Sequence, residues 1–442
     1  MTNFKPSSNY KYSGEQWMGC IPSNWEVTKI KWLTSIKRGA SPRPIDDPKY
    51  FDEQGEYAWV RIADVSKSKK YLESTFQRMS ELGSSLSVKR EPGDIFLSIA
   101  GTVGKPCITN IKCCIHDGFV YFPDFKGEVR FLYYLFESGE PYKGLGKMGT
   151  QLNLNTDTVG SIVIPNLELS LQKSISDYLD FKTEQIDTLI EEKNRFISLL
   201  EEKRQSMITK AVTKGLNPNV KMKDSGSKWL GQVPEHWIIT SLKNFWAVID
   251  CKHVTAEFVD EGIPVASIRE VQGRFVDLNN AKKTTKFYYD QLIKGGRKPI
   301  PGDLIFSRNA TVGEVAQVAS WHPAFAIGQD VCVIRKNKVD LSSDFLQYVT
   351  RSKVVIEQLE NLMVGATFKR VNVEDIRNLV IPMPPSEEQA FISSFLENKI
   401  GKIDALITEV YNTINLLKEY RQSLIYEAVT GKVDVRNFEV VS

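Results

Sequence analysis

The 442-residue sequence lacks the features that define several classes of protein. It contains no run of about eighteen apolar residues, so no apolar membrane-spanning helix is indicated. Its six cysteines show no Cys-x-x-Cys spacing and its four histidines are scattered, so neither a disulfide framework nor a metal site is indicated. The first residues lack the apolar core of a signal peptide, and we therefore expect a cytoplasmic protein. The net charge of +3 does not by itself indicate nucleic-acid binding.

Sequence motifs of catalysis are also missing. No Asn or Asp precedes Pro-Pro-Tyr or Pro-Pro-Phe, the arrangement that would hold a flipped adenine for methylation, and the nearest string is Met383-Pro-Pro-Ser386. The segment from Gly101 to Pro106 is too short for a phosphate-binding loop and has proline where Ser or Thr should follow the lysine. We therefore expect no catalytic residues, no metal site and no cofactor bound by this chain.

Length and internal similarity predict a duplicated, multidomain chain. A chain of 442 residues is too long for a typical single core, and its 42% apolar and 25% charged fractions are those of a globular protein. The motif Trp17-Met-Gly-Cys-Ile-Pro-Ser-Asn-Trp25 is answered 212 positions later by Trp229-Leu-Gly-Gln-Val-Pro-Glu-His-Trp237. Each motif therefore opens one half of the chain.

Matched turns within the two halves predict β-hairpins. Pro-Gly-Asp at 92–94 and 301–303 predicts a turn that leads into an apolar strand, and Thr-Val-Gly at 102–104 and 311–313 predicts the turn back. The aspartate of each Pro-Gly-Asp turn is expected to bond nearby backbone N–H groups rather than to act in acid catalysis. Each half closes with a strand that ends in proline, at Pro165 and Pro382.

Two long helices follow these strands, from Gln172 to about Val212 and from Gln389 to about Val429. Their sequences match at a constant offset of 217 positions, so that Ile-Asp-Thr-Leu-Ile at 186–190 answers Ile-Asp-Ala-Leu-Ile at 403–407. Apolar residues at steps of three, four or seven predict a seam along which the two helices pack lengthwise. The predicted seam residues are Ile175, Leu179, Ile186, Leu189, Phe196, Leu200 and Met207, and Leu396, Ile403, Leu406, Val410, Leu417 and Leu424.

Together these patterns predict an α+β fold. Two similar globular domains are separated by two long helices, which form an antiparallel coiled coil with approximate two-fold symmetry. Each domain is expected to combine short strands with a few helices, including Phe131–Glu137 and Asp344–Glu360. The predicted segments are residues 1–166 for the first domain, 167–216 for the first spacer helix, 217–383 for the second domain, and 384–442 for the second helix and the C-terminal tail.

The order and spacing of these repeats resemble the specificity subunit of type I restriction–modification enzymes. The resemblance covers nearly the whole chain and is carried by the twin tryptophan motifs, the twin hairpin turns and the twin junctions between strand, proline and helix. The second junction, Ile381-Pro-Met-Pro-Pro-Ser-Glu-Glu-Gln-Ala-Phe-Ile392, is similar to the family pattern. The first junction keeps Pro165, Gln172 and Ile175 but replaces the Pro-Pro and acidic residues.

This resemblance implies a role in recognition. Each domain would be a target-recognition domain that reads one part of a bipartite double-stranded DNA sequence, and the helices would fix the gap. The helices would also dock modification (methyltransferase) subunits, which methylate adenine, and restriction subunits would join them. S-adenosylmethionine, ATP and magnesium would be bound by those partners, and no membrane would be involved. An alternative stays open, in which the chain is a duplicated coiled-coil adaptor that binds proteins rather than DNA.

Candidate DNA contacts are the basic and amide side chains of loops, because Arg and Lys read guanine while Asn and Gln read adenine. The loops after Gly149 and Gly365 carry different polar residues at aligned positions, as expected for two different half-sites. A competing interpretation is that these residues, and the isolated basic residues elsewhere, are solvated or contact phosphate. The candidates are Gln151, Asn153, Asn155, Thr367, Lys369 and Arg370 on those two loops, and Arg38, Arg43, Arg61, Lys105, Arg269, Arg308 and Asn309 elsewhere.

The remaining loops and aromatic residues are interpreted as structural. His116-Asp117-Gly118 and Gly328-Gln329-Asp330 are predicted to be matched turns. Trp59, Trp246 and Trp321 are predicted to lie in the core, and the cysteines are predicted to be small buried residues.

Overall fold

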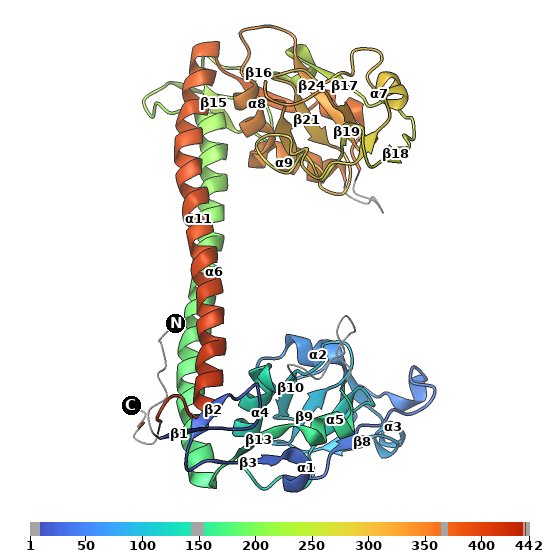
Figure 1. Cartoon of the computed structure of the whole chain (residues 1–442). Helices are drawn as coiled ribbons and strands as arrows, with labels where there is room; N and C mark the ends of the chain where they lie inside the picture. Colours follow the sequence, from blue (N-terminus) through green and yellow to red (C-terminus); the bar gives the residue numbers. More distant parts are fainter. Residues whose placement is uncertain (1–8, 143–153, 364–369, 436–437, 439–442) are drawn as a thin grey trace. The chain divides into compact units, whose positions relative to one another are not determined.

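A computed structural model describes residues 9–142, 154–363, 370–435 and 438 (Figure 1). The chain divides into two compact units: unit 1 is Met1–Lys193 with Asn412–Ser442, and unit 2 is Asn194–Tyr411. The two long helices, α6 (Leu169–Lys214) and α11 (Ser386–Val429), each contribute a part to both units. This confirms the two predicted helices, both of which begin three residues earlier than expected. Within the described ranges, no helix is long and apolar enough to cross a membrane.

Two small mixed sheets form the globular part of unit 1. The five-stranded sheet has the order β4-β12-β9-β10-β6, and the four-stranded sheet has the order β7-β5-β11-β8. As the turns predicted, β9 and β10 form an antiparallel hairpin in which Leu97 lies opposite Pro106. The elements of unit 1 before α6 are β1 (Tyr10–Tyr12), β2 (Cys20–Pro22), β3 (Glu26–Lys29), α1 (Ile30–Leu33), β4 (Lys37–Arg38), η1 (Pro48–Tyr50), β5 (Tyr57–Val60), α2 (Ile62–Lys67), β6 (Tyr71–Leu72), β7 (Gln77–Met79), α3 (Glu81–Ser85), β8 (Val88–Arg90), β9 (Ile95–Ser98), β10 (Pro106–Thr109), β11 (Cys113–Ile115), β12 (Phe119–Tyr121), α4 (Val129–Glu137), η2 (Glu140–Tyr142), α5 (Thr156–Ser161) and β13 (Val163–Asn166).

Unit 2 repeats this plan with two four-stranded sheets, in the orders β17-β24-β21-β22 and β18-β20-β19-β23. Its hairpin, β21 with β22, places Phe306 opposite Val315. The elements between α6 and α11 are β14 (Met222–Asp224), β15 (Gln232–Pro234), β16 (Ile238–Ser241), η3 (Leu242–Asn244), β17 (Trp246–Ile249), β18 (Phe258–Val259), β19 (Ile263–Ala266), β20 (Lys283–Thr284), α7 (Lys286–Leu292), β21 (Leu304–Ser307), β22 (Val315–Gln317), β23 (Ala326–Ile327), β24 (Val331–Lys336), α8 (Ser343–Thr350), α9 (Lys353–Leu362), α10 (Val373–Arg377) and β25 (Val380–Met383).

The two tryptophan motifs form matched hairpins. Gly19 and Gly231 turn the chain at φ of +61° and +60°, a left-handed conformation that glycine adopts without the steric cost of a Cβ atom. The second tryptophan of each motif, Trp25 or Trp237, is buried. Behind each lies the glycine that ends a long helix, so that Gly431 meets Trp25 and Gly215 meets Trp237.

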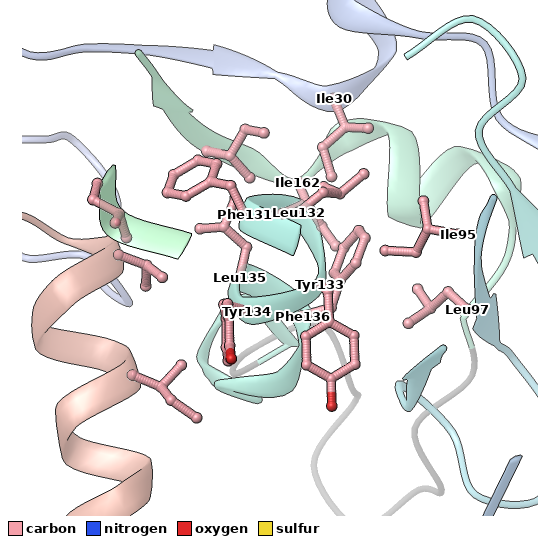
Figure 2. Packing of buried hydrophobic residues seen from close by; sticks show 14 of the residues in the cluster. Ile30, Ile95, Leu97, Phe131, Leu132, Tyr133, Tyr134, Leu135, Phe136 and Ile162 are labelled. Atoms are coloured by element: carbon pink, nitrogen blue, oxygen red, sulfur yellow. The ribbon is translucent and has the colours of Figure 1, made fainter. Parts of the chain in front are cut away.

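In unit 1, α4 is the hydrophobic link between the sheet and the long helices (Figure 2). Six consecutive residues of α4, from Phe131 to Phe136, are buried. Each large apolar side chain buried in this way contributes roughly 1.5–3 kcal/mol to stability. Figure 2 shows these side chains beside Ile95 and Leu97 of β9 and beside Ile30 and Ile162, in one core that also contains Ile175, Leu179 and Ile186 of α6 and Leu424, Ile425, Ala428 and Val429 of α11.

In each unit, α6 and α11 pack in antiparallel directions. Residues early in α6 share the core of unit 1 with residues late in α11, and in unit 2 the late residues of α6 pack with early residues of α11. Matched ion pairs set the same register: Arg421 Nε lies 3.0 Å from Asp187 Oδ1, and Arg204 Nη1 lies 2.9 Å from Asp404 Oδ1. Arg204 and Asp404 are partly exposed, so their pair contributes at most about 1 kcal/mol.

Matched glutamines connect the long helices to the globular parts. Gln172 Oε1 accepts a hydrogen bond from Glu128 N at 2.9 Å, and Gln389 Oε1 accepts one from Ser342 N at 3.0 Å. In both cases the donor is the backbone N–H of the residue that precedes a buried helix, α4 or α8. Each glutamine also donates through Nε2 to a carbonyl five residues before it. The replaced residues of the first junction therefore leave this contact unchanged.

Two details of the predicted helices are wrong. Leu189, Phe196 and Leu406 are 39%, 42% and 38% exposed and do not belong to the buried seam, whereas Ile197 and Ile407, one position further on, are buried. The predicted helix Asp344–Glu360 is two helices, α8 and α9, because the chain takes an extended conformation at the cap residue that precedes α9.

The predictions for aromatic residues are confirmed in two cases and wrong in the third. Trp59 and Trp246 are fully buried, but Trp321 is 68% exposed. Trp321 packs against the edge of Phe275, with 4.9 Å between the ring centroids. The cysteines are free thiols, and all but the half-buried Cys20 are buried, as predicted.

Candidate nucleic-acid interface

In unit 1, four loops meet at one edge of the two sheets. The strands β5 and β11 are parallel, so the residues that follow them lie at the same edge. The hairpin tip after β9 joins them there, because Ile99 N donates to Gly118 O at 2.8 Å. We call residues 38–43, 61–64, 99–105 and 116–118 the loop edge of unit 1.

Asp117 holds three side chains of this loop edge. Its carboxylate accepts hydrogen bonds from Ser41 Oγ at 2.9 Å and from Arg43 Nη2 at 3.2 Å. Its backbone carbonyl accepts a hydrogen bond from Arg38 Nε. Partial burial opposes ionisation, but the hydrogen bonds and the charge of Arg43 together keep the pKa of Asp117 below its ordinary value. The turn that was interpreted as structural is therefore the anchor for two predicted DNA contacts, Arg38 and Arg43.

The adjoining histidine is a neutral packing residue. His116 lies against Trp59 and Phe119, and its Nδ1 accepts a hydrogen bond from Gly118 N at 2.8 Å. Burial lowers the pKa of His116, and the charges of Arg61 and Arg38 lower it further, whereas the neighbouring Asp117 opposes this shift. His116 therefore contributes packing rather than positive charge to this edge.

The other basic candidates of unit 1, Arg61 and Lys105, differ in whether their charged groups already have hydrogen-bond partners. The Arg61 side chain is exposed, and its backbone N–H donates to Asp64 Oδ2 at 2.8 Å. Lys105 Nζ donates to the carbonyls of Ser66 and Ser68 at 3.1 and 2.8 Å, which ties the hairpin tip to the end of α2. Arg61 is thus available to a ligand, whereas Lys105 already has backbone partners.

The corresponding loop edge of unit 2 consists of residues 250–255, 267–270, 308–314, 328–330 and 370–372. Arg308 N donates to Asp330 O and Val371 N donates to Arg308 O, both at 2.9 Å. A β-bridge also pairs Asn309 with Arg370. The structure thus brings together three predicted contacts, Arg308, Asn309 and Arg370, that are distant in the sequence.

The side chains of this edge differ in availability. Asn309 is partly committed, because its Nδ2 donates to Asp330 at 3.2 Å and its Oδ1 accepts from Ala310 N at 2.9 Å. Arg269, Gln329 and Arg370 are exposed, and so are Lys252, His253 and Thr255 in the first loop of this edge. Arg269 follows β19, whose neighbour β23 runs parallel to it and leads into the turn at Gln329.

Arg308 differs from its prediction as an exposed DNA contact, because its side chain is 4% exposed. Its Nη2 lies 2.9 Å from Asp250 Oδ1, 3.0 Å from Gln329 O and 3.4 Å from Cys251 Sγ. Among the described residues, Asp250, Cys251 and His253 form the group whose side chains could together hold a metal ion, because their possible ligand atoms lie within 4.8 Å of one another. Because a guanidinium cation already occupies this group, a divalent ion would meet charge repulsion there.

Asn155 has a structural function in the described part of the chain. Its Oδ1 accepts from Thr158 N at 2.8 Å and caps α5. Asn372 precedes α10 in the same way, 217 positions later, and the residues before them, Leu154 and Val371, are both buried. Alignment of the two loops from Gly149 and Gly365 places Asn155 opposite Val371 and is therefore one residue out of register. The predicted contacts Gln151, Asn153, Thr367 and Lys369 lie outside the described residues.

A cleft of about 1050 Å³ in unit 1 is a poorer candidate for DNA. Basic residues of the globular part and acidic residues of α6 both line it. Lys70 and Asp180 form an ion pair at 2.5 Å, and Lys69 pairs with Glu191. These carboxylates neutralise the lysines, so the cleft lacks the net positive charge that binds phosphates.

The sequence interpretation of the turns after β11 and β23 as purely structural did not include the contacts that Asp117 makes with Arg38 and Arg43. Asp117 and Gln329 occupy matched places in the two turns, yet one is a carboxylate and the other an amide. The sequence contains this difference but does not indicate which side chain Asp117 contacts. Only the structure shows that Asp117 is already paired with an arginine.

Comparison with known proteins supports the duplicated plan. The family model described as "Type I restriction modification DNA specificity domain" matches residues 22–198 and, again, residues 238–416. The chain belongs to this family. Each unit therefore carries most of one DNA specificity domain, and the role of the chain is DNA sequence specificity in a type I restriction–modification system.

Relatives match over most or half of their length. The chain is 25% identical over 470 residues to the putative type I restriction enzyme MjaX specificity subunit of Methanocaldococcus jannaschii, with 99% of both chains covered. It is 24% identical over 219 residues to the EcoKI specificity subunit of Escherichia coli strain K12, a match that covers 47% of this chain and 46% of that subunit. A solved chain, from work on complex assembly and conformational transition of the type I R-M system, has a TM-score of 0.70 at 17% identity and covers 93% of this chain and 99% of its own. This likeness confirms the fold.

Proposed function

We propose that the chain reads a bipartite DNA target, with one half-site contacted by the loop edge of each unit. The observation that carries this proposal is the repetition of one backbone arrangement with different exposed side chains. Both edges join a hairpin tip to a neighbouring turn, through Ile99 to Gly118 and through Arg308 to Asp330. Unit 1 presents arginines held by Asp117, whereas unit 2 presents Gln329 and Arg370. Shared backbone with different side chains suits two readers of two different sequences.

In this proposal the chain is a recognition subunit without catalytic activity of its own. Modification subunits would bring S-adenosylmethionine and methylate adenine, and restriction subunits would use ATP and magnesium to cleave DNA. The complex would act in the cytoplasm. The alternative, an adaptor that binds proteins and not DNA, has no support from the specificity role of the family.

The surface of the long helices suits two equivalent docking sites for modification subunits. Leu189 of α6 and Leu416 of α11 are exposed in unit 1, and their counterparts Leu406 and Leu199 are exposed in unit 2. The counterparts are related by the 217-position offset of the two helices. Exposed leucines at matched positions in both units indicate two equivalent surfaces, each of which one copy of a partner would cover.

The test is DNA binding by the chain purified with its modification subunits. We expect protection of one discontinuous sequence, methylation of adenines within it, and an affinity that falls as salt concentration rises because phosphate contacts release counterions. The chain alone should transfer no methyl groups. Absence of sequence-specific DNA binding by the complex would refute the proposal and favour a protein-binding adaptor.

A further inference from the structure

The guanidinium groups of Arg38 and Arg43 are presented in a fixed orientation. Arg43 is 71% exposed, yet its Nη2 is held by the carboxylate of Asp117 at 3.2 Å. Arg38 is exposed too, and its Nε is held by the carbonyl of Asp117. Ser41 binds the other carboxylate oxygen, which fixes the plane of the carboxylate. Each arginine therefore keeps one nitrogen on the turn and leaves the rest of its planar fork free for a ligand.

The turn itself is fixed to the sheets. Gly39 N donates to Phe119 O at 2.9 Å, and Ala40 N donates to Ile115 O at 3.1 Å, so the segment that carries both arginines runs along the two strands that flank Asp117. Gly39 has no room for a Cβ atom, which would lie 2.2 Å from the carbonyl oxygen of His116. The backbone of this segment is thus fixed beside the turn at Asp117, and the side-chain contacts to Asp117 then orient the two guanidinium groups.

The matched place in unit 2 has different chemistry. Gln329 stands where Asp117 stands in unit 1. Its backbone carbonyl accepts from the buried Arg308 at 3.0 Å, as that of Asp117 accepts from Arg38, but its amide side chain has no charge with which to hold an arginine. Its Nε2 is 3.4 Å from Thr255 Oγ1. Groups that hold the DNA backbone should be kept in both units because phosphates are the same everywhere, whereas groups that read bases should differ. The difference between Asp117 and Gln329 therefore points to base reading.

We propose that Asp117 is a positioning residue that aims Arg43 and Arg38 at a guanine in the half-site read by unit 1. This inference rests on the proposed function. Guanine presents two acceptors, N7 and O6, side by side in the major groove, and a planar fork held in one orientation matches them with two parallel hydrogen bonds. A phosphate can also accept two parallel bonds from an arginine fork, so the choice of a base over a phosphate rests on the difference between the side chains of Asp117 and Gln329.

The experiment uses the complex with modification subunits and the DNA target found for the unaltered chain. Each guanine of the first half-site is replaced in turn by 7-deazaguanine, which lacks the N7 acceptor. For the unaltered complex we expect one position at which this replacement weakens binding about five- to 100-fold. Asp117→Asn and Arg43→Ala should make binding insensitive to the replacement at that position, and Arg43→Lys should show a smaller effect than the unaltered complex because lysine lacks the planar fork.

Two controls make the result specific. Asp124→Asn is the same carboxylate-to-amide change at a residue of unit 1 that accepts from Ser35 at 2.8 Å, and it should leave the 7-deazaguanine profile unchanged. Gln329→Ala should alter recognition in the second half-site only. Thermal unfolding of each variant checks that the unit remains folded, and the scan on the unaltered complex needs no variant.

Three outcomes would overturn this inference. The first is a half-site for unit 1 without a guanine that responds to 7-deazaguanine. The second is an Asp117→Asn variant that keeps the unaltered profile. The third is an Arg43→Ala variant that weakens binding equally to all sequences and reduces the salt dependence by about one phosphate, which would assign Arg43 to the DNA backbone. Sequence-specific binding by the unaltered complex would leave the proposed function standing in every case, whereas its absence would refute that function first.

Discussion

Glu137 and Arg351 occupy matched places at the ends of α4 and α8 but carry opposite charges. The carbonyl of Glu137 accepts from Gln422 Nε2 at 2.8 Å, and the carbonyl of Arg351 accepts from Gln205 Nε2 at 2.9 Å. The Glu137 carboxylate then pairs with Arg421 at 3.3 Å, whereas Arg351 turns to backbone carbonyls. The backbone contact is thus kept in both units while the side chains have diverged.

Glu137 should make the stability of unit 1 depend on pH. Burial raises the pKa of Glu137 above its ordinary value of 4.5, although Arg421 opposes this rise. Between the two pKa values the folded state binds more protons than the unfolded state, so stability falls as pH rises through that window. We expect Glu137→Gln to remove this slope, as measured by urea unfolding at several pH values from 4 upward. Identical pH slopes for both proteins would contradict the assignment.

Ala310 occupies a strained backbone position. Its φ is +54°, whereas the matched residue of unit 1 is a glycine, Gly101, at +64°. A left-handed conformation costs a residue with a Cβ atom roughly 1–2 kcal/mol, and glycine adds a smaller entropic cost in the unfolded chain. Ala310→Gly should therefore stabilise unit 2 by about 0.5–1 kcal/mol.

The reverse change provides the control for this prediction. In Gly101→Ala the new Cβ atom would lie 3.0 Å from Ile62 Cγ2, in addition to the backbone strain. It should destabilise unit 1, and urea unfolding measures both changes. Loss of stability in Ala310→Gly would show that the Cβ atom of Ala310 makes contacts that outweigh the strain.

For the helices and strands, the repeated residues predicted which segments are helices and hairpins. They did not predict which apolar residues of a helix face inward. Leu189 and Leu406 have the spacing of seam residues and still lie on the surface. Two apolar stripes on one helix share the same period, so spacing alone cannot tell the stripe that packs inside the chain from one that a partner covers. Contacts in three dimensions were needed to separate them.

The surface stripe should carry the docking of modification subunits. Changing Leu189 and Leu416 together to lysine places two charges on the proposed site of unit 1 and should remove one modification subunit from the complex. The matched pair in unit 2, Leu199 and Leu406, should remove the other. Native mass measurement of the purified complexes gives the number of subunits. Full occupancy in both double variants would place the docking site elsewhere.

For the whole molecule, duplication was the property that sequence predicted best. Long-range pairs within a unit were not predictable, because Arg43 and Asp117 are 74 residues apart and the residue matched to Asp117 in the other half, Gln329, is not acidic. The one-residue error at Asn155 had a different cause, since an alignment that starts from Gly149 and Gly365 misses the matched residues Asn155 and Asn372 that precede α5 and α10. The repeat thus predicts the backbone arrangement that the two units share, and in our proposal the residues that differ between the units carry the specificity.

The long helices contribute residues to both units, so we expect their length to set the number of base pairs between the two recognised half-sites. We consider an insertion of seven residues in each, between Lys193 and Asn194 in α6 and between Tyr411 and Asn412 in α11. Seven residues preserve the spacing of the apolar seam and lengthen each helix by about 10 Å, which corresponds to about three base pairs. Mapping of methylated adenines should show the same two half-sites separated by a longer gap.

The same insertion should also weaken binding. Three base pairs rotate the DNA by about 100°, whereas seven residues leave the helix within about 20° of its former orientation. The two loop edges would then meet their half-sites only if the helices or the DNA twist, and this twist costs free energy. We therefore expect a longer gap together with a lower affinity. An unchanged gap would show that the spacing is set by the partner subunits instead of by α6 and α11.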